Sequence, residues 1–148
     1  MYDFQVIVGY ASKMIQIGKT CINKALKSIG LSSSEADVLM FLYANGDGIR
    51  QDQIAAGVEV SKPAISRTIR SLEKKGYIIR EQSPKDRREY YVYLSAKALQ
   101  HKQFIQKQYA DIVEAACRGI SEEKVTEIVG LFRKVIENME DYRIEHGA

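Results

Sequence analysis

The sequence contains few residues that could crosslink the chain or hold a metal. Only two cysteines and two histidines occur in 148 residues. Cys21 and Cys117 lie far apart with no Cys-x-x-Cys pair, so the spacing predicts neither a disulfide framework nor a zinc site. No basic residue is placed to lower the pKa of Cys21, so we expect unreactive thiols. We also expect the thiols to be buried and the compartment to be reducing. His101 and His146 lack ligating neighbours and are expected to be exposed, and no metal or cofactor is predicted.

Long apolar runs and enzyme motifs are also absent. No apolar run approaches the ~18 residues of a membrane span, and Met1-Tyr2-Asp3-Phe4 lacks the basic-then-apolar layout of a secretion signal. We therefore expect a cytoplasmic protein that does not associate with a membrane. No glycine-rich phosphate loop, Gly-x-Ser-x-Gly elbow or pair of catalytic carboxylates occurs. No catalytic residue is assigned, and an enzyme is not expected.

Helical spacing dominates what is present. Apolar residues recur every three to four positions in five segments, and a capping box at Ser32 to Glu35 opens the second of them. These helices are expected at residues 4–29, 32–45, 61–75, 95–118 and 121–146, with a short one at 51–56. Two apolar-polar alternations, at 77–81 and 89–94, predict a hairpin. The predicted fold class is mainly α with a small β-hairpin.

The helices at 51–56 and 61–75 have the lengths and the short connection of a helix-turn-helix. Val58 and Val60 in the connection are expected to return to the core. In the second helix, Ser61 is the predicted N-cap, Pro63 fits the first turn and Gly76 ends the helix. At 100° per residue one side of this helix is apolar. The other side carries Lys62, Pro63, Ser66, Arg67, Arg70, Glu73 and Lys74.

Positive charge is concentrated in this part of the chain. Residues 61–88 contain nine basic and three acidic residues, a net charge of +6, while the whole chain carries +3. The remainder is therefore at −3, and an anionic partner is expected to meet residues 61–88. Two simpler interpretations stay open: a solvated amphipathic helix face and a flexible polar loop.

Residues of this basic region suit DNA. Arg67 and Arg70 can each donate two hydrogen bonds to a guanine, Ser66 can serve a base edge or a phosphate, and arginines at the hairpin tip suit a narrow minor groove. The predicted DNA-binding residues are Ser61, Lys62, Pro63, Ser66, Arg67, Arg70, Lys74, Lys85, Asp86, Arg87 and Arg88.

The segments 60–67 and 73–78, with Asp86-Arg87-Arg88 and Val92-Tyr93-Leu94-Ser95, resemble the MarR family of bacterial regulators across essentially the whole chain. The resemblance implies a winged helix-turn-helix with 61–75 as recognition helix, a wing at 82–88, and a dimer made by the first and last helices. It also implies promoter repression or activation, often relieved by small aromatic ligands or oxidation. The family's Asp-x-Arg wing motif falls on Asp86 and Arg88, which makes Arg88 the expected minor-groove contact and Asp86 its ion-pair partner.

Arg87 is then expected to contact a phosphate. Two positions depart from expected patterns. Glu59 stands where many helix-turn-helix sequences have glycine, and Ala98 stands where the family often has glycine after the wing.

The expected organisation is one domain over residues 1–148. Its winged helix-turn-helix lobe spans 31–98, and 1–30 and 99–148 form dimerisation helices, because the terminal helices are more apolar than one small lobe needs. An effector pocket could lie between these helices and the lobe, although the same residues would also suit an ordinary core. The pocket candidates are Tyr10, Met14, Met40 and Tyr43, with Phe41 and Tyr109.

The sequence thus predicts a sequence-specific regulator, a repressor that binds a palindromic operator as a homodimer and is released by a small aromatic effector. Two alternatives remain: a winged-helix module that binds another protein, and an architectural protein that binds DNA of any sequence. The basic helix face argues against the first, and only a comparison of DNA sequences separates the second.

Overall fold

The predicted helical periodicity becomes seven α-helices, one 3-10 helix and three short strands in a computed structural model that describes residues 3–147. The chain divides into two compact units, one up to Ile112 and one from Val113 onward, and α6 crosses the division. The elements of the first unit are α1 (Phe4–Ala25), the 3-10 helix η1 (Lys27–Ile29), α2 (Ser33–Asn45), β1 (Ile49–Arg50), α3 (Gln51–Gly57), α4 (Lys62–Lys74), β2 (Ile78–Gln82), β3 (Tyr90–Leu94), α5 (Ala96–Gln100) and most of α6 (Lys102–Ala116). The second unit contains the end of α6 and α7 (Glu122–Glu145).

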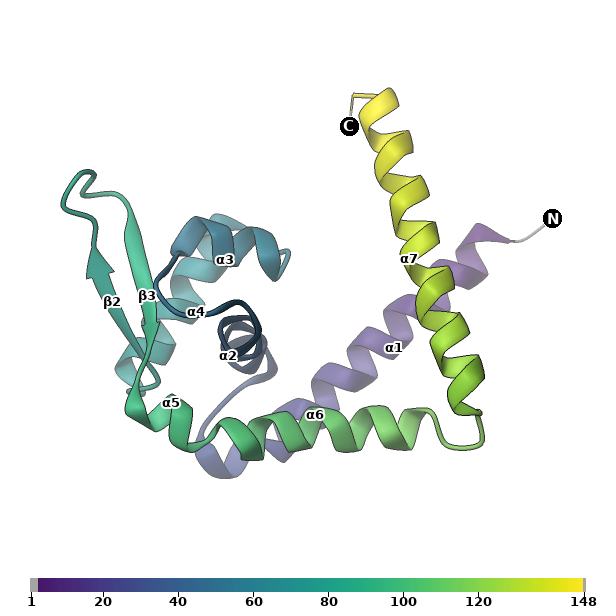
Figure 1. Cartoon of the computed structure of the whole chain (residues 1–148), viewed down its shortest axis with the longest axis horizontal. Helices are drawn as coiled ribbons and strands as arrows, with labels where there is room; N and C mark the ends of the chain where they lie inside the picture. The colour runs from purple at the N-terminus through teal and green to yellow at the C-terminus, as the bar shows by residue number, and fades with distance from the viewer. Residues whose placement is uncertain (1–2, 148) are drawn as a thin grey trace. The chain divides into compact units, whose positions relative to one another are not determined.

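The predicted fold class is confirmed, with one addition to the hairpin. Strands β2 and β3 pair antiparallel, and the two-residue strand β1 joins the other edge of β3 to give the order β1-β3-β2. Ile49 lies opposite Val92 and Arg50 opposite Tyr91. Two residues are too few to show an alternating pattern, so β1 could not be predicted from the sequence. Figure 1 shows the hairpin extending beside α3 and α4.

The prediction of one helix over 95–118 was wrong. Ser95 caps α5 through its hydroxyl, which accepts a hydrogen bond from the Ala98 amide at 3.2 Å. Helix α5 ends at Gln100, and His101 is its C-cap before α6 begins. His101 is partly buried, not exposed, since its ring packs edge-on against the buried Tyr77 ring, with 5.7 Å between the ring centroids. Helical spacing continues through this corner and therefore hides it. His146 is exposed, as expected.

The core of the first unit lies where α2, α3, α4 and the sheet meet. Its buried apolar residues are Ile22, Leu26, Leu31, Ala36, Val38, Leu39, Leu42, Ile54, Ala55, Ile65, Ile69, Leu72, Tyr77, Ile78, Val92, Ala98 and Ile105. The predicted capping box of α2 is present, because the Ser32 hydroxyl accepts from the Glu35 amide and the Glu35 carboxylate accepts from the Ser32 amide. Val58 packs against the core as expected, whereas Val60 is 42% exposed and does not.

The turn between α3 and α4 contains two tight backbone positions. Glu59 has a φ of 57°, the left-handed conformation in which glycine is usual, so the departure noted at this position carries backbone strain. At the end of α3, Gly57 packs so closely on the Phe41 ring of α2 that a Cβ atom at this position would overlap the ring. This contact sets how near α3 lies to α2.

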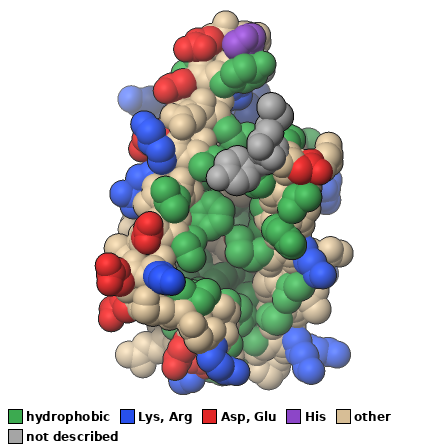
Figure 2. All heavy atoms as spheres, turned by 90° about the vertical axis from the view of Figure 1, so that its right-hand side faces the viewer, with side chains coloured by type: hydrophobic (Ala, Val, Ile, Leu, Met, Phe, Trp, Pro, Cys, Tyr) green, Lys and Arg blue, Asp and Glu red, His purple; other side chains and the backbone are tan. Residues whose placement is uncertain are grey.

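In the second unit, α7 buries none of its described side chains within this chain. Its exposed large apolar residues are Ile128, Val129, Leu131, Phe132, Val135, Ile136, Met139, Tyr142 and Ile144. In the first unit, α1 likewise exposes Phe4, Val6, Ile7, Val8, Tyr10, Met14, Ile15 and Ile17. Figure 2 shows exposed apolar side chains in green among charged ones. Within residues 3–147, no helix has the length and apolar character needed to span a membrane.

We predict that Gly57→Ala lowers the free energy of unfolding by about 1–3 kcal/mol, because the new methyl group must displace the Phe41 ring from a packed position. Helix propensity alone would favour alanine by about 1 kcal/mol. Urea denaturation at one fixed protein concentration measures the change. In a Phe41→Ala background the overlap is gone, so Gly57→Ala should be neutral or stabilising there. An equal loss in both backgrounds would contradict the contact.

Candidate nucleic-acid interface

The outward face of α4 is the first part of the candidate interface. Ile65, Ile69 and Leu72 bury the back of the helix, with exposures of 1% or less. Ser61 begins the helix as predicted, since its hydroxyl accepts from the Ala64 amide at 3.2 Å, and Pro63 lies in the first turn. The opposite side is consequently turned to solvent. It carries Lys62, Pro63, Arg67, Arg70 and Lys74 as exposed residues and Ser66 as a partly buried one.

Two of the nine basic residues in the 61–88 region are committed to contacts inside the lobe. The Lys75 ammonium lies 2.8 Å from the Glu35 carboxylate, and the Arg80 guanidinium lies 3.8 Å from the Glu73 carboxylate. Neither was among the predicted DNA-binding residues. The other seven are exposed: Lys62, Arg67, Arg70, Lys74, Lys85, Arg87 and Arg88.

In the structure the wing is the hairpin of β2 and β3 with the loop between them. Its tip, residues 83–89, is ordered by its own polar contacts. The buried Ser83 hydroxyl accepts from the backbone amides of Lys85 and Asp86 at 3.2 and 3.4 Å, and the Gln82 side-chain Nε2 donates to the Arg87 carbonyl at 2.8 Å. The Asp86 carboxylate accepts from the Arg88 amide at 2.9 Å and from its guanidinium at 3.4 Å. These contacts present a fixed basic tip.

The expected ion pair between Asp86 and Arg88 is therefore present in the wing. The pKa of Asp86 lies below its ordinary value, chiefly because the Arg88 amide donates to the carboxylate; burial opposes this, and the nearby Arg88 guanidinium lowers the pKa further. The Arg88 side chain remains 90% exposed. It is held at one end by Asp86 and is still accessible to a partner.

Arg80 braces the wing against α4. Its guanidinium carbon lies 4.2 Å from the centroid of the Tyr90 ring on β3, while the same group pairs with Glu73 on α4. The side chain is only 20% exposed. At the opposite edge of the sheet, Arg50 of β1 pairs with Glu89 at 3.8 Å and with Asp52 of α3 at 3.6 Å. The wing is thus connected to both helices of the helix-turn-helix.

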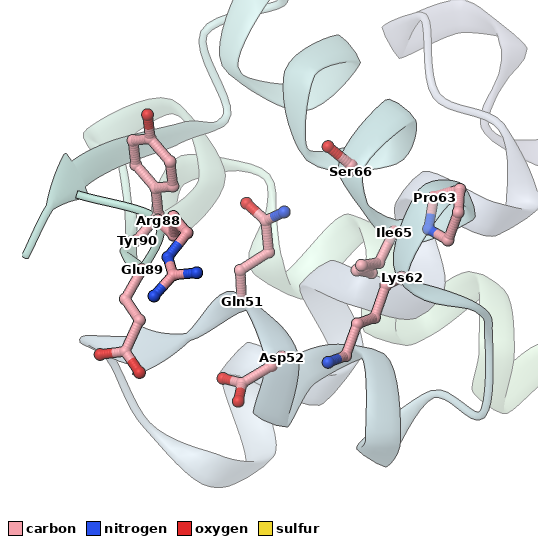
Figure 3. Close-up of a pocket in the computed structure, with 9 residues that line it drawn as sticks. All are labelled: Gln51, Asp52, Lys62, Pro63, Ile65, Ser66, Arg88, Glu89 and Tyr90. Carbon is pink, nitrogen blue, oxygen red and sulfur yellow. The ribbon is translucent and has the colours of Figure 1, made fainter. Parts of the chain in front are cut away.

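A cleft of about 480 Å³ lies between the first turn of α4, the first turn of α3 and the part of the wing that leads into β3. Figure 3 shows Lys62, Pro63 and Ser66 on its α4 side and Arg88 on its wing side. Five residues of its lining were not predicted as site residues: Gln51, Asp52, Glu89 and Tyr90, together with the core residue Ile65. For Gln51 and Asp52, the only local signal in the sequence was that a helix begins after Gly48-Ile49.

The candidate effector residues lie in different environments. Tyr10 and Met14 are exposed on α1, whereas Met40 and Tyr43 pack against the core and the Tyr43 hydroxyl donates to the Ala98 carbonyl at 2.6 Å. Burial, with a smaller contribution from Tyr77, raises the pKa of Tyr43 to about 12. These four residues line neither the cleft described above nor a second one under the start of α4. The effector pocket stays a prediction.

The cysteines differ from expectation. Cys21 is exposed and Cys117 is partly buried within this chain, so the expectation of buried thiols was wrong. The apolar side of α1 that holds Cys21 is itself uncovered, which is the physical reason. Across residues 3–147, no group of three or more His, Cys, Asp or Glu side chains is arranged to hold a metal ion.

Comparisons with known proteins agree with this architecture. A model of the MarR family matches residues 29–89. The HTH-type transcriptional regulator YkoM of Bacillus subtilis (strain 168) is 30% identical over 108 residues, which make up 73% of this chain and 70% of that protein. The crystal structure of a MarR transcriptional regulator from Methanosarcina mazei Go1 is similar with a TM-score of 0.87 and 26% identity, over 93% of this chain and 99% of that chain.

The structure of the S. aureus MepR-DNA complex is similar with a TM-score of 0.78, over 94% of this chain and 99% of that chain. At 19% identity this likeness concerns the fold alone.

The two exposed parts of the interface lead to different predictions. Arg70→Ala should relax the preference for particular bases, because one bidentate contact to a guanine contributes about 1–3 kcal/mol of discrimination. Lys85→Ala should weaken binding to all DNA about equally and reduce the slope of log affinity against log salt by about 1. Fluorescence titrations against several duplexes at several salt concentrations measure both effects, with Lys27→Ala on η1 as the control. Uniform loss from both variants would contradict the assignment of α4 as the reading helix.

Proposed function

Because this chain belongs to the MarR family of transcriptional regulators, we propose that it binds double-stranded DNA sequence-specifically, as a homodimer on a palindromic operator. The family consists of regulators and not of enzymes. The observation that carries the proposal is the arrangement of exposed basic residues on two rigidly connected elements, α4 and the wing tip. An α-helix fits the major groove, and an arginine at a wing tip fits the adjacent minor groove.

In this proposal Arg67 and Arg70 read base edges, with Ser66 beside them. Arg88 enters the minor groove, while Lys85 and Arg87 contact phosphates. The ordered tip supports this role for Arg88, because a side chain already oriented by Asp86 loses less conformational freedom on binding. The S. aureus relative bound to DNA has the same fold, which is compatible with this mode of binding.

The proposed homodimer rests on the terminal helices. Apolar stripes of this size are normally covered, and no described side chain of α7 is buried within the chain. The two helices also have opposite charge. Helix α1 contains three lysines and no acidic residue, whereas α7 contains seven acidic and four basic residues. A second copy can therefore supply both an apolar and an oppositely charged surface, and two-fold symmetry would place two copies of α4 about one DNA turn apart.

Repression is the proposed direction, since a dimer that occupies promoter DNA hinders access to it, and the proposed compartment is the bacterial cytoplasm. Release by a small aromatic effector is proposed as well. A cleft of about 370 Å³ under the start of α4 is large enough for a small ligand. Its lining includes Ile15 of α1, Val38 of α2 and Ala64 of α4. A ligand there would press on the reading helix.

Selection from a random duplex library tests the proposed function. The full chain at moderate salt should enrich a palindrome whose half-sites lie about one turn apart, and Arg88→Ala should weaken the enrichment. Failure to enrich any sequence, with binding that only follows salt, would favour an architectural DNA binder.

A pair of α7 variants tests the dimer in the same selection. Ile136→Glu places a carboxylate in the exposed apolar stripe and should give a monomer by sedimentation, with loss of the palindrome. Thr126→Glu adds the same charge on the side of α7 away from the centre of this stripe and should leave both the dimer and the palindrome intact. A wild-type chain that sediments as a monomer would contradict the proposal.

A further inference from the structure

Glu35 is the only aspartate or glutamate that is buried among residues 3–147. It lies in the first turn of α2, and its carboxylate has three partners. Oε1 accepts from the Ser32 amide at 2.9 Å and from the Lys75 ammonium at 2.8 Å, and Oε2 accepts from the Ser71 hydroxyl at 2.7 Å. A buried carboxylate with all its partners in place is held in one geometry.

Two of these partners belong to the end of α4. Ser71 lies in its last turn, and Lys75 is its C-cap. Lys75 also donates to the Gly30 carbonyl at 2.7 Å, and the buried Tyr77, just beyond α4, donates to the Ile29 carbonyl at 2.8 Å. The C-terminal end of α4 is therefore tied by directional bonds to residues 29–35, which form the end of the connection between α1 and α2 and the first turn of α2.

The Glu35 side chain is charged at neutral pH in this arrangement. Burial by itself would raise the pKa of Glu35, but the hydrogen bonds from Lys75, the Ser32 amide and Ser71 outweigh it, and the pKa lies below its ordinary value. Lys75 thus faces a full negative charge, and loss of either partner leaves the other one uncompensated.

The apolar back of α4 cannot supply the same restraint. Burial of Ile65, Ile69 and Leu72 opposes separation of the helix from the lobe, but the hydrophobic effect has no direction and tolerates small tilts. A 13-residue helix is about 20 Å long. A tilt of about 5° around its C-terminal end moves the first turn by nearly 2 Å, which exceeds the distance range of a hydrogen bond to a base.

We infer that Glu35 and Lys75 are positioning residues for DNA reading: they fix the end of α4 on the first turn of α2 and on the connection that precedes it, and so set the angle of its exposed face. The inference rests on the proposed function, since it concerns how accurately α4 meets base edges. It also gives α1 a route to the reading helix, because the connection that receives Lys75 and Tyr77 begins where α1 ends.

A double-mutant cycle on DNA specificity tests the inference. Glu35→Gln, Lys75→Met and the double variant are compared with wild type for the ratio of affinities between the selected duplex and random-sequence DNA. Titrations are made at one salt concentration, well below each melting temperature. Each single variant should lower this ratio about tenfold, the loss of roughly one base contact. The double variant should lower it no further, because the two residues act through each other.

The controls separate positioning from charge and from stability. Lys27→Met removes an exposed cation from the same connection and should leave the ratio unchanged. Lys75→Arg keeps the charge and the donors and should retain the ratio within about threefold. If Glu35→Gln unfolds the chain, Ser71→Ala removes a single hydrogen bond and should still lower the ratio about threefold.

Three outcomes are decisive. A wild-type chain with equal affinity for both DNAs would overturn the proposed function itself. A discriminating wild type with variants that melt earlier but keep its ratio would show that the pair only stabilises the lobe. Reductions that add up in the double variant would show that Glu35 and Lys75 do not act as a pair. Either of the last two results overturns the inference and leaves the proposed function standing.

Discussion

The burial of one side of α4 determines what the rest of this lobe can do. Ile65, Ile69 and Leu72 are almost completely removed from solvent, and burial of each contributes about 1.5–3 kcal/mol. Exposed charges on the same helix contribute far less to folding, about 0–1 kcal/mol per ion pair. The apolar residues therefore decide which face turns inward, and the basic residues are free to serve a partner.

Positive charge in this region has two separate uses. Lys75 and Arg80 form contacts inside the lobe, with Glu35 in one case and with Glu73 and the Tyr90 ring in the other. Both contacts join α4 to a neighbouring element, the first turn of α2 or the wing. The remaining basic residues of α4 and the wing tip point outward. Internal contacts thus hold the geometry in which the outward residues can meet two grooves of one duplex.

Local signals in the sequence predicted much of this structure. The capping box at Ser32, the N-cap at Ser61 and the helix stop at Gly76 each depend on residues a few positions apart, and the structure contains all three. The ion pair of Asp86 with Arg88 is present as well, but it was expected from the resemblance to the MarR family and not from a local signal.

Features that depend on distant residues could not be predicted in this way. Strand β1 exists only because β3 pairs with it, and Lys75 finds Glu35 40 positions away in the sequence. A count of charges cannot distinguish Lys75 from its exposed neighbour Lys74. Likewise, the cleft beside the wing joins Gln51 and Tyr90 from separate elements. Whether the predicted DNA contacts are made depends on the complex and stays a prediction.

Methylation protection of the bound DNA tests the central claim, that α4 and the wing read two different grooves. Dimethyl sulfate modifies guanine N7 in the major groove and adenine N3 in the minor groove, so one experiment reports on both. The account predicts protection of both atoms in each half-site, with loss of the guanine protection in Arg70→Ala and loss of the adenine protection in Arg88→Ala. Protection confined to one groove, or unchanged by either substitution, would contradict it.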